Sequence, residues 1–357
     1  MRFLMLTQRE LKVISEYATI LFSETEALMK FYIVDAFTED LFGGNPAGVV
    51  ILPQGGTFPQ VKLMKKVAAE LRYSETAFVL PDDEDSFYLR YFTPTEEVDL
   101  CGHATIASFH ALWDAGMIRE DTDYRALTMA GEIKVHISDG TVIMSMAEPK
   151  RIATISDPLE LDRLYDIMGG EYDASLGLAP MIISTGLPDI ILPVSNLDEL
   201  NSLAPDMNKL AELSEHYGVT GVHAFTIDDA ANGTNNTSDT NESTTADTSA
   251  TGGADILIHA RNFAPLYGID EEAATGTANG ALTHYLSLNK KIGLPATCKI
   301  VQGEAMGRPS IIMTYLKYSS VGAYVLDGPS LESEFPMPPE IFVGGSARIL
   351  AKGDINI

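Results

Sequence analysis

Short motifs recur in the same order in the two halves of this chain, and this repetition constrains the fold more than any other feature. The matching segments are 44–46 and 186–188, 77–78 and 224–225, 90–94 and 261–265, and 101–104 and 275–278. Each match is short, but four matches in one order argue against coincidence. The sequence therefore predicts two folding units of similar topology within its 357 residues.

One spacing differs between the two copies and marks an insertion. Phe78 and Arg90 are 12 residues apart, whereas their counterparts Phe225 and Arg261 are 36 residues apart. Residues 228–255 account for the difference, since they hold six acidic residues, no Lys or Arg and almost no large apolar side chain. Such a segment cannot bury enough apolar surface to offset its ordering entropy. We therefore predict a disordered loop in the second copy.

Short apolar runs bounded by turn residues predict a strand-rich chain with few long helices. The expected strands cover 31–36, 48–52, 76–80, 87–92, 132–137, 141–146, 181–184, 190–194, 224–226 and 255–263. Helical periodicity predicts helices over 63–72, 105–115 and 278–288. Many strands around one long helix in each half indicate the α+β class, with two similar domains that face each other.

These patterns also suggest domain boundaries. The first 28 residues carry four Glu and lack the long apolar run of a secretory signal, so we expect a helical, solvent-facing extension. The first domain then spans 29–148 and the second spans 149–330. We expect the strands of 331–357 to pack back on the first domain.

The charge balance excludes several classes of function. Lys and Arg total 24 and Asp and Glu total 50, which gives a formal net charge of −26. Binding to nucleic acid or to an anionic membrane needs clustered Lys and Arg, so we expect neither partner. Cys101 and Cys298 alone cannot build a disulfide framework or a Cys-rich zinc site. No apolar run approaches the ~20 residues of a membrane span, and we expect a cytoplasmic protein that holds no metal.

Two predicted helix starts could bind an anion. Gly102 and Gly276 each open a helical pattern, and a glycine there lets a ligand approach the free backbone N–H groups and the positive end of the helix dipole. If the two halves face each other, both N–H clusters point into one cavity, which would suit a small carboxylate substrate. The alternative is a pair of ordinary helix starts that use glycine only for its backbone freedom.

Three side chains near these starts could carry acid–base chemistry. Glu75 precedes an apolar strand, where a carboxyl group either pairs, caps a turn or works as an acid or base with a raised pKa. His103 follows the first helix start and could reach the same cavity, or it could be a structural histidine. Cys101 lies where a helix start lowers a thiol pKa, but its counterpart in the second copy is Thr275.

Several segments together resemble the phenazine-biosynthesis PhzF family. In the first half they are Asp-Ala-Phe-Thr at 35–38, Phe-Gly-Gly-Asn-Pro-Ala at 42–47, Ser-Glu-Thr-Ala-Phe-Val at 74–79, Arg-Tyr-Phe-Thr-Pro at 90–94 and Cys-Gly-His-Ala-Thr at 101–105. In the second half they are Ser-Thr-Gly-Leu-Pro at 184–188, Gly-Ile-Asp-Glu at 268–271, Ala-Thr-Gly-Thr-Ala at 274–278, Gln-Gly at 302–303, Gly-Arg-Pro-Ser at 307–310 and Val-Gly-Gly at 343–345. The resemblance covers the chain from about residue 29 onward, without the insertion.

The resemblance implies the diaminopimelate-epimerase fold, in which two pseudo-symmetric domains, each a β-barrel-like sheet around a central helix, hold the active site between them. Members of the family are isomerases that need no cofactor, and they are often homodimers. In the phenazine enzyme the Glu of the matching motif moves a proton on a dihydro-hydroxyanthranilate. By motif position that residue is Glu75 here.

The same resemblance assigns binding roles to further residues. The family His and Gly at the first helix are His103 and Gly102. At the second helix, Glu272 replaces the family Asp and Thr277 replaces the family Ser next to Gly276. Both replacements keep the functional group, but Glu is one methylene longer, so the shape of the pocket and the substrate can differ. The His that often follows in the family is Asn279 here.

Three functions follow from these observations. The first is a PhzF-like isomerase that shifts a proton on a small carboxylate, with Glu75 as acid and base, His103 and Glu272 orienting the substrate, and the amides at 102 and 276–277 holding its carboxylate. The second is a racemase or epimerase of the two-Cys type, against which Thr275 argues because a hydroxyl is a far weaker acid than a thiol. The third is a non-catalytic binding protein on the same fold.

Overall fold

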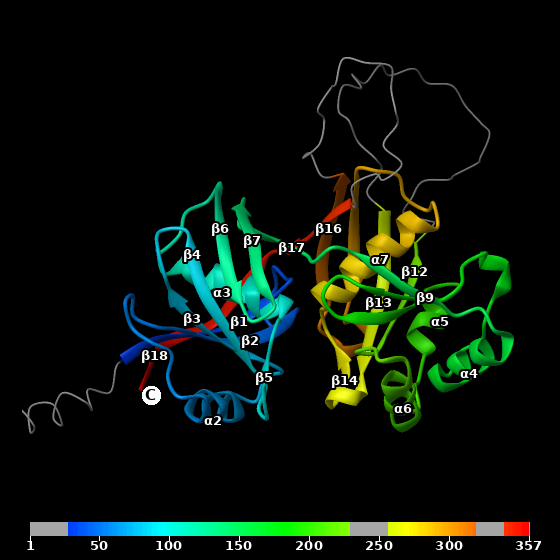
Figure 1. Cartoon of the computed structure of the whole chain (residues 1–357), viewed down its shortest axis with the longest axis horizontal. Helices are drawn as coiled ribbons and strands as arrows, with labels where there is room; N and C mark the ends of the chain where they lie inside the picture. The colour runs from blue at the N-terminus through cyan, green and yellow to red at the C-terminus, as the bar shows by residue number, and fades with distance from the viewer. Residues whose placement is uncertain (1–27, 229–255, 319–338, 357) are drawn as a thin grey trace, which may run out of the picture.

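The computed structural model describes residues 28–228, 256–318 and 339–356. The predicted N-terminal extension, except Leu28, and the predicted disordered loop, except Asp228, lie outside the described residues. The described chain forms two bodies that lie side by side, with the first half in blue to green and the second in green to orange (Figure 1).

The described strands form one continuous sheet of 18 strands. Those of the first half are β1 (Leu28–Ala36), β2 (Asn45–Ile51), β3 (Thr76–Pro81), β4 (Ser86–Phe92), β5 (Glu97–Val98), β6 (Thr122–Thr128), β7 (Gly131–Ser138) and β8 (Thr141–Ser145). Those that follow are β9 (Lys150–Thr154), β10 (Met181–Ser184), β11 (Pro188–Pro193), β12 (Val222–Ile227), β13 (Ile256–Ala264), β14 (Ile269–Glu272), β15 (Ala296–Gln302), β16 (Ser310–Tyr318), β17 (Pro339–Gly345) and β18 (Ala347–Asn356).

The order of strand pairings is the same in both halves. In the first half β1–β2 is antiparallel, β2–β3 parallel, β3–β4 antiparallel, β4–β6 parallel, and β6–β7 and β7–β8 antiparallel. In the second half the same sequence of directions runs through β10, β11, β12, β13, β15, β16 and β17. The α+β class and the pseudo-symmetric fold predicted from the sequence are therefore confirmed.

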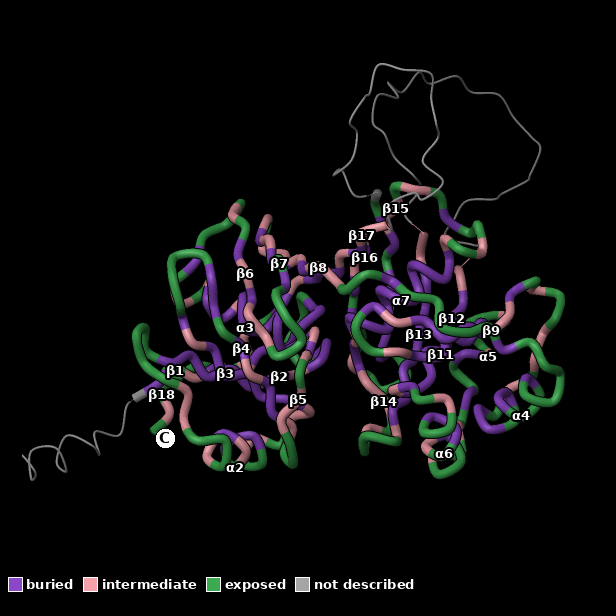
Figure 2. Tube along the Cα trace, in the orientation of Figure 1, coloured by how far each residue is buried: buried purple, intermediate pink, exposed green. Residues whose placement is uncertain are grey.

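Each half wraps its strands around one central helix, α3 (Gly102–Asp114) or α7 (Gly276–Leu288). Both helices are apolar on nearly all sides, which is typical of a helix enclosed on every face. Figure 2 shows both as buried, and the first eleven residues of α7 are all buried. Their N-terminal ends meet at the boundary between the halves, where a Cβ added to Gly102 would lie 3.5 Å from the Cα of Gly276.

Two strands cross between the halves. β8 pairs with β17 in antiparallel fashion and joins the two parts of the sheet. After β8 the chain enters the second half, where β9 pairs with β10, and after β17 it returns to the first half, where β18 pairs with β1 over the whole length of that strand. Each half therefore contains one edge strand that is supplied from beyond its own repeat.

The expectation of one long helix in each half was incomplete. The helix predicted over 63–72 is present as α2 (Val61–Leu71) in the first half. Three helices of the second half were not predicted: α4 (Pro158–Met168), α5 (Leu197–Ser202) and α6 (Met207–Tyr217). The latter three pack on the outer face of the second-half strands and form a separate apolar core with them. No helix of the described residues is both long and apolar enough to cross a membrane.

One of the four sequence matches was misaligned by one residue. Arg90 pairs with Phe78 in the β3–β4 ladder, whereas Arg261 pairs with Ala224, not Phe225, in the β12–β13 ladder. A shift of one residue moves a side chain to the opposite face of a sheet. Accordingly Phe78 packs against α2 on the outside, while Phe225 packs toward the central helix α7.

Candidate active site

A cleft of about 1210 Å³ lies between the two halves. Residues from both halves line it, including all six positions that the sequence assigned to the site: Glu75, Gly102, His103, Glu272, Gly276 and Thr277. They come from the start of β3, the end of β14 and the first turns of α3 and α7. The repeated topology brings these elements together, because each half presents the N-terminus of its central helix to the other.

The first turns of the two central helices offer backbone N–H groups to this cleft. The intrahelical hydrogen bonds begin only when Thr105 N donates to Cys101 O and Asn279 N donates to Thr275 O. The preceding N–H groups, including those of Gly102 and Gly276, therefore lie outside the helical ladders. Since both helix dipoles also point their positive ends here, the boundary between the helices is suited to an anionic group.

Glu75 and His103 form a close pair inside the cleft. His103 Nε2 lies 3.3 Å from Glu75 Oε2, and both residues are buried, with 3% and 8% of their surface exposed. Ser74 Oγ lies 3.3 Å from the same ring nitrogen. The pair places a buried carboxyl group beside a histidine ring at the wall of the cleft, within reach of a bound molecule, as proton transfer requires.

Asn45 fixes the proton on the His103 ring. Its Nδ2 donates to Ala274 O at 2.9 Å and lies 3.2 Å from His103 Nδ1. An amide nitrogen only donates, so in this amide orientation Nδ1 is the acceptor and a neutral ring carries its proton on Nε2, facing Glu75. The same side chain connects the halves, because Ala274 precedes the second central helix.

Burial shifts the pKa values of this pair toward the uncharged forms. It raises the pKa of Glu75, against which hydrogen bonds from Ser74 and Cys101 act. It also lowers the pKa of His103, opposed by the charge of Glu272. A carboxyl group whose pKa moves upward can both accept and return a proton near neutral pH.

Glu272 approaches the cleft from the second half. Thr275 Oγ1 donates to its Oε2 at 2.7 Å, and Gln302 Nε2 donates to its backbone oxygen at 2.8 Å. Burial and the charge of Glu75 raise its pKa, against the opposing effects of His103, Thr275 and Asn45. The charge of Glu75 therefore disfavours the ionised form of Glu272, and ionising both carboxyl groups at once is unfavourable.

Asn279, which stands where the family often has His, belongs to a buried polar network that sequence reasoning missed. Its Nδ2 donates to Gln302 Oε1 at 2.7 Å and to Thr275 O at 2.8 Å, and its Oδ1 lies 3.1 Å from His223 Nε2. On the other side of the ring, Asn262 Nδ2 lies 3.3 Å from His223 Nδ1. The network supports the start of α7 from behind.

Cys101 lies at the N-cap of α3 but has the properties of a buried thiol. Its Sγ lies 3.5 Å from His103 Nδ1. Burial and the nearby charge of Glu75 raise its pKa well above the usual value, so the expected lowering by the helix start is overcome. The thiol therefore stays protonated, and it serves as a hydrogen-bond donor to Glu75.

Among the described residues, Glu75, Cys101 and His103 form a cluster that could approach a metal ion, with ligand atoms within 4.8 Å of one another. A metal ligand must offer a free lone pair. In the arrangement above, Nδ1 of His103 accepts from Asn45, Nε2 carries a proton and the thiol is protonated. These residues fit proton transfer better than they fit metal binding.

Asp189, at the second residue of β11, also lines the cleft and was missed in the sequence. It is 1% exposed, and its Oδ1 has no hydrogen-bond partner among the described residues. A comparison of the two halves could not find this residue, because its counterpart in the first half is Ala47 of β2, which has no acidic side chain.

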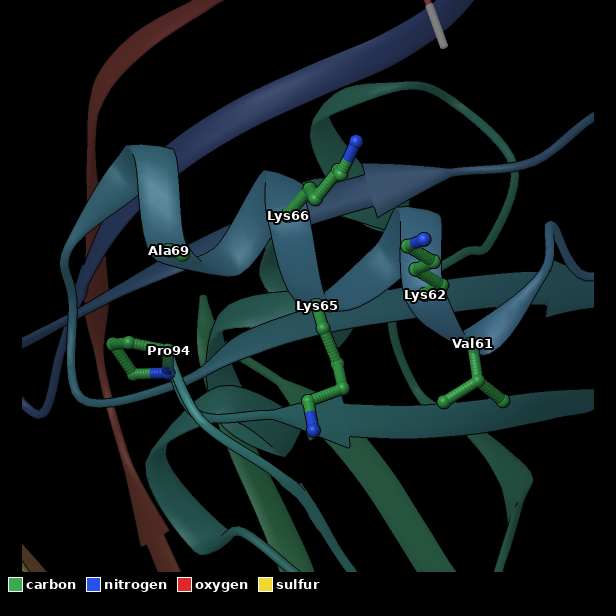
Figure 3. Close-up of a pocket in the computed structure, with 6 residues that line it drawn as sticks. All are labelled: Val61, Lys62, Lys65, Lys66, Ala69 and Pro94. Carbon is green, nitrogen blue, oxygen red and sulfur yellow. The ribbon is translucent and has the colours of Figure 1, made fainter.

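A second hollow, of about 570 Å³, lies along α2 beside Pro94 and is lined by Lys62, Lys65 and Lys66. Figure 3 shows that Lys65 and Lys66 point to different sides of the helix. The three ammonium groups therefore do not converge on one ligand position, and Pro94 separates this hollow from the cleft, which it also lines.

Three comparisons with known proteins match this picture. The sequence model of the PhzC-PhzF family, described as phenazine biosynthesis-like protein, matches residues 34–328. An uncharacterised isomerase of Clostridium acetobutylicum is 30% identical over 349 residues, which cover 91% of this chain and 97% of the relative.

Solved structures share the fold at lower identity. A PhzF-family phenazine biosynthesis protein of Bacillus anthracis has a TM-score of 0.71 at 23% identity, covering 93% of this chain and 100% of the other. A hydroxyproline epimerase of Agrobacterium vitis, solved with bound trans-4-hydroxy-L-proline, has a TM-score of 0.54 at 14% identity, covering 92% of this chain and 91% of the other.

Proposed function

Because this chain belongs to the PhzC-PhzF, phenazine biosynthesis-like family of isomerases, we propose that it shifts a proton on a small carboxylate substrate without a cofactor, with Glu75 as the acid and base. The observation that carries the proposal is the Glu75–His103 pair, with its 3.3 Å separation, in a cleft that also holds two helix N-termini. The substrate would be a carboxylic acid with an activated C–H bond.

The proposed reaction begins with an ionised Glu75. The carboxylate removes a proton from the substrate carbon, and the electron pair of the broken C–H bond moves into the adjoining π system and carboxylate. The N–H groups at the starts of α3 and α7 stabilise the negative charge that develops there. The protonated Glu75 then returns its proton to a different carbon, so that no proton or electron is gained or lost overall.

His103 and Glu272 orient the substrate in this proposal. The ring of His103 lies with Nε2 3.3 Å from Oε2 of Glu75 and turns its N–H dipole toward the charge of that carboxylate, although no hydrogen bond joins the two atoms among the described residues. Glu272, supported by the Thr275 hydroxyl, faces the substrate from the other half. Thr277 also lines the cleft, and its side chain is larger by one methyl group than the Ser of the family, which leaves less room for the substrate.

The test measures hydrogen exchange and isomerisation by NMR in D₂O. The probes are dihydro-hydroxyanthranilate, which the resemblance suggests, and trans-4-hydroxy-L-proline, which is bound in the Agrobacterium vitis epimerase, together with a set of amino and hydroxy acids. Glu75→Gln should lower turnover of any reactive probe by ~10²–10⁴-fold, the usual range for general acid–base catalysis. Binding should persist, because the amide keeps the shape of the carboxyl group.

Glu96→Gln is the matched control, since Glu96 is an exposed residue on the rim of the same cleft. It should leave turnover unchanged. An active Glu75→Gln protein would overturn the assignment of Glu75, and a wild-type protein that binds a probe without exchange or turnover would favour the non-catalytic binding protein.

The homodimer and the cytoplasmic location expected from the sequence remain part of this proposal. The pairing of two copies is tested by light scattering after size-exclusion chromatography, where a monomer mass would contradict it. The location is tested by fractionation of cells that express the whole chain.

A further inference from the structure

Asp189 is a buried acid in the cleft whose partner is missing. It is 1% exposed, it lines the cleft, and its Oδ1 makes no hydrogen bond to any described residue. A buried carboxyl oxygen without a partner is costly, and such atoms at a cleft wall point to a molecule that binds there. The described residues that line the cleft include one Arg, Arg72, and no Lys.

The pseudo-symmetry relates this carboxyl group to Glu75. In the first half Gly48 N donates to Glu75 O, and in the second half Ile190 N donates to Gly221 O. Gly221 is therefore the counterpart of Glu75, and it has no side chain of its own. A Cβ at Gly221 would lie only 1.8 Å from Phe263 O, so no other residue fits there.

Asp189 supplies a carboxyl group to the place that Gly221 leaves empty. Its carboxyl group accepts a hydrogen bond from the backbone N–H of Gly221. Each half thus presents one buried carboxyl group next to equivalent backbone: Glu75 from the position before β3 and Asp189 from the neighbouring strand β11. The two groups face the cleft from opposite halves.

Glu272 interacts electrostatically with both of these acids. The charge of Glu75 acts on Glu272, and the charge of Glu272 acts on Asp189. Burial, together with the Glu272 charge, raises the pKa of Asp189 to about 8. Asp189 therefore holds a proton at neutral pH and can donate it.

We propose that Asp189 is a second proton-transfer group of this site: Glu75 removes a proton from the substrate on the side of the first half, and Asp189, instead of Glu75, returns a proton on the side of the second half. The proposal rests on the proposed isomerase function. It also supplies the second acid that the two-Cys racemases have and that Thr275 cannot provide.

The Glu75 carboxylate takes the proton of the substrate C–H bond, and the bonding electrons enter the π system of the substrate. Those electrons then form a new C–H bond with the proton of the Asp189 carboxyl group, which becomes a carboxylate. Each turnover leaves Glu75 protonated and Asp189 ionised, and exchange with water restores both. Solvent hydrogen therefore enters the product.

The first experiment titrates Asp189 in the free protein and needs no substrate. The protein is labelled with ¹³C at the Asp carboxyl carbons and followed by NMR from pH 4 to 10. One resonance should titrate near neutral pH or above and be absent in Asp189→Asn, but remain in Asp270→Asn, which alters an exposed Asp of the same cleft. If Asp189→Asn does not fold, Asp189→Ser gives the assignment. An Asp189 resonance that titrates below pH 5 would overturn the proposal.

The second experiment uses the probes named above in D₂O. With a reactive probe, Asp189→Asn should keep exchange of the proton that Glu75 removes but lose formation of the isomer by ~10²–10⁴-fold. Wild-type product should carry solvent deuterium at the new C–H bond. Isomer formation at the wild-type rate by Asp189→Asn, or product without deuterium, would overturn the role of Asp189 and leave Glu75 catalysis intact. If the wild type shows neither exchange nor isomerisation with any probe, the proposed function is contradicted. The titration still decides whether Asp189 can act as an acid.

Discussion

Arg308 of the second half forms an ion pair with Asp35 of the first half, with 2.8 Å between Nη2 and Oδ1. The same guanidinium donates to the backbone oxygens of Gly44 and Gly43 at 2.9 and 2.8 Å. Asp35 is 1% exposed and also accepts from Phe42 N. One arginine therefore binds residues 43–44, which directly precede Asn45 of β2, to the second half.

Arg308→Ala should destabilise the protein by ~2 kcal/mol, because it leaves a buried carboxylate without its ionic partner. Urea unfolding measures the change. Arg125→Ala is the matched control, since Arg125 forms an exposed ion pair with Asp85, and it should cost less than ~1 kcal/mol. Equal effects of the two substitutions would show that the Arg308 contact does not hold the halves together.

A short Gly-Ser linker in place of residues 229–255 should leave the free energy of unfolding within ~1 kcal/mol of wild type, because loop length contributes only weakly to stability. The linker can close the gap, since Asp228 N donates to Leu257 O at 3.0 Å and the two ends lie on adjacent strands. Thermal unfolding of both chains checks this. A fall of many degrees would mean that the removed residues pack on the protein.

Cys101→Ser should retain most of its turnover with any probe that the wild type converts. The thiol is protonated at neutral pH because burial raises its pKa, and only the thiolate is a strong nucleophile. Iodoacetamide should therefore modify folded protein much more slowly than urea-unfolded protein. Complete inactivation of Cys101→Ser with the fold intact would support the two-Cys racemase instead.

Acid should weaken the fold through His223. Burial lowers its pKa to about 4, below the ~6.5 of an exposed histidine. Between these pH values the unfolded chain binds more protons than the folded one. The contribution of His223 to the free energy of unfolding is therefore complete above pH 6.5 and is lost as the pH falls toward 4. The loss is on the order of 3 kcal/mol.

The comparison variant for this prediction is His223→Gln, whose amide offers one acceptor toward Asn262 and one donor toward Asn279. Urea unfolding at pH 7, 5.5 and 4.5 should show a smaller acid-dependent loss in the variant than in wild type. The same pH dependence in both proteins would show that other groups cause the loss.

The sequence predicted the fold class and both central helices because these features recur in two copies. Gly102 and Gly276 begin apolar helices whose starts match in position, and the strands stand out as short apolar runs between turn residues. The helices α4 to α6 were missed, since they belong to the second half alone and have no counterpart pattern in the first. The one-residue error at Phe225 arose because a residue match carries no information on which sheet face it occupies.

The candidate site was only partly predictable for a related reason. Repeated or motif-borne residues such as Glu75 and Gly276 could be found in the sequence. Asp189 could not, because Ala47 is its counterpart and only the folded chain shows that its carboxyl group lies beside Gly221. The ring orientation of His103 likewise depends on Asn45, which is 58 residues away in the chain.

The pairing of β18 with β1 separates the order of synthesis from the order of assembly. A ribosome that has made the whole first repeat has not yet made residues 347–356, so the outer edge of β1 stays open until the last strand emerges. An unpaired strand edge invites association with other chains. Expressing the two halves as separate proteins would therefore yield one piece with an open edge and another with a strand that belongs elsewhere, and neither would be a self-sufficient domain.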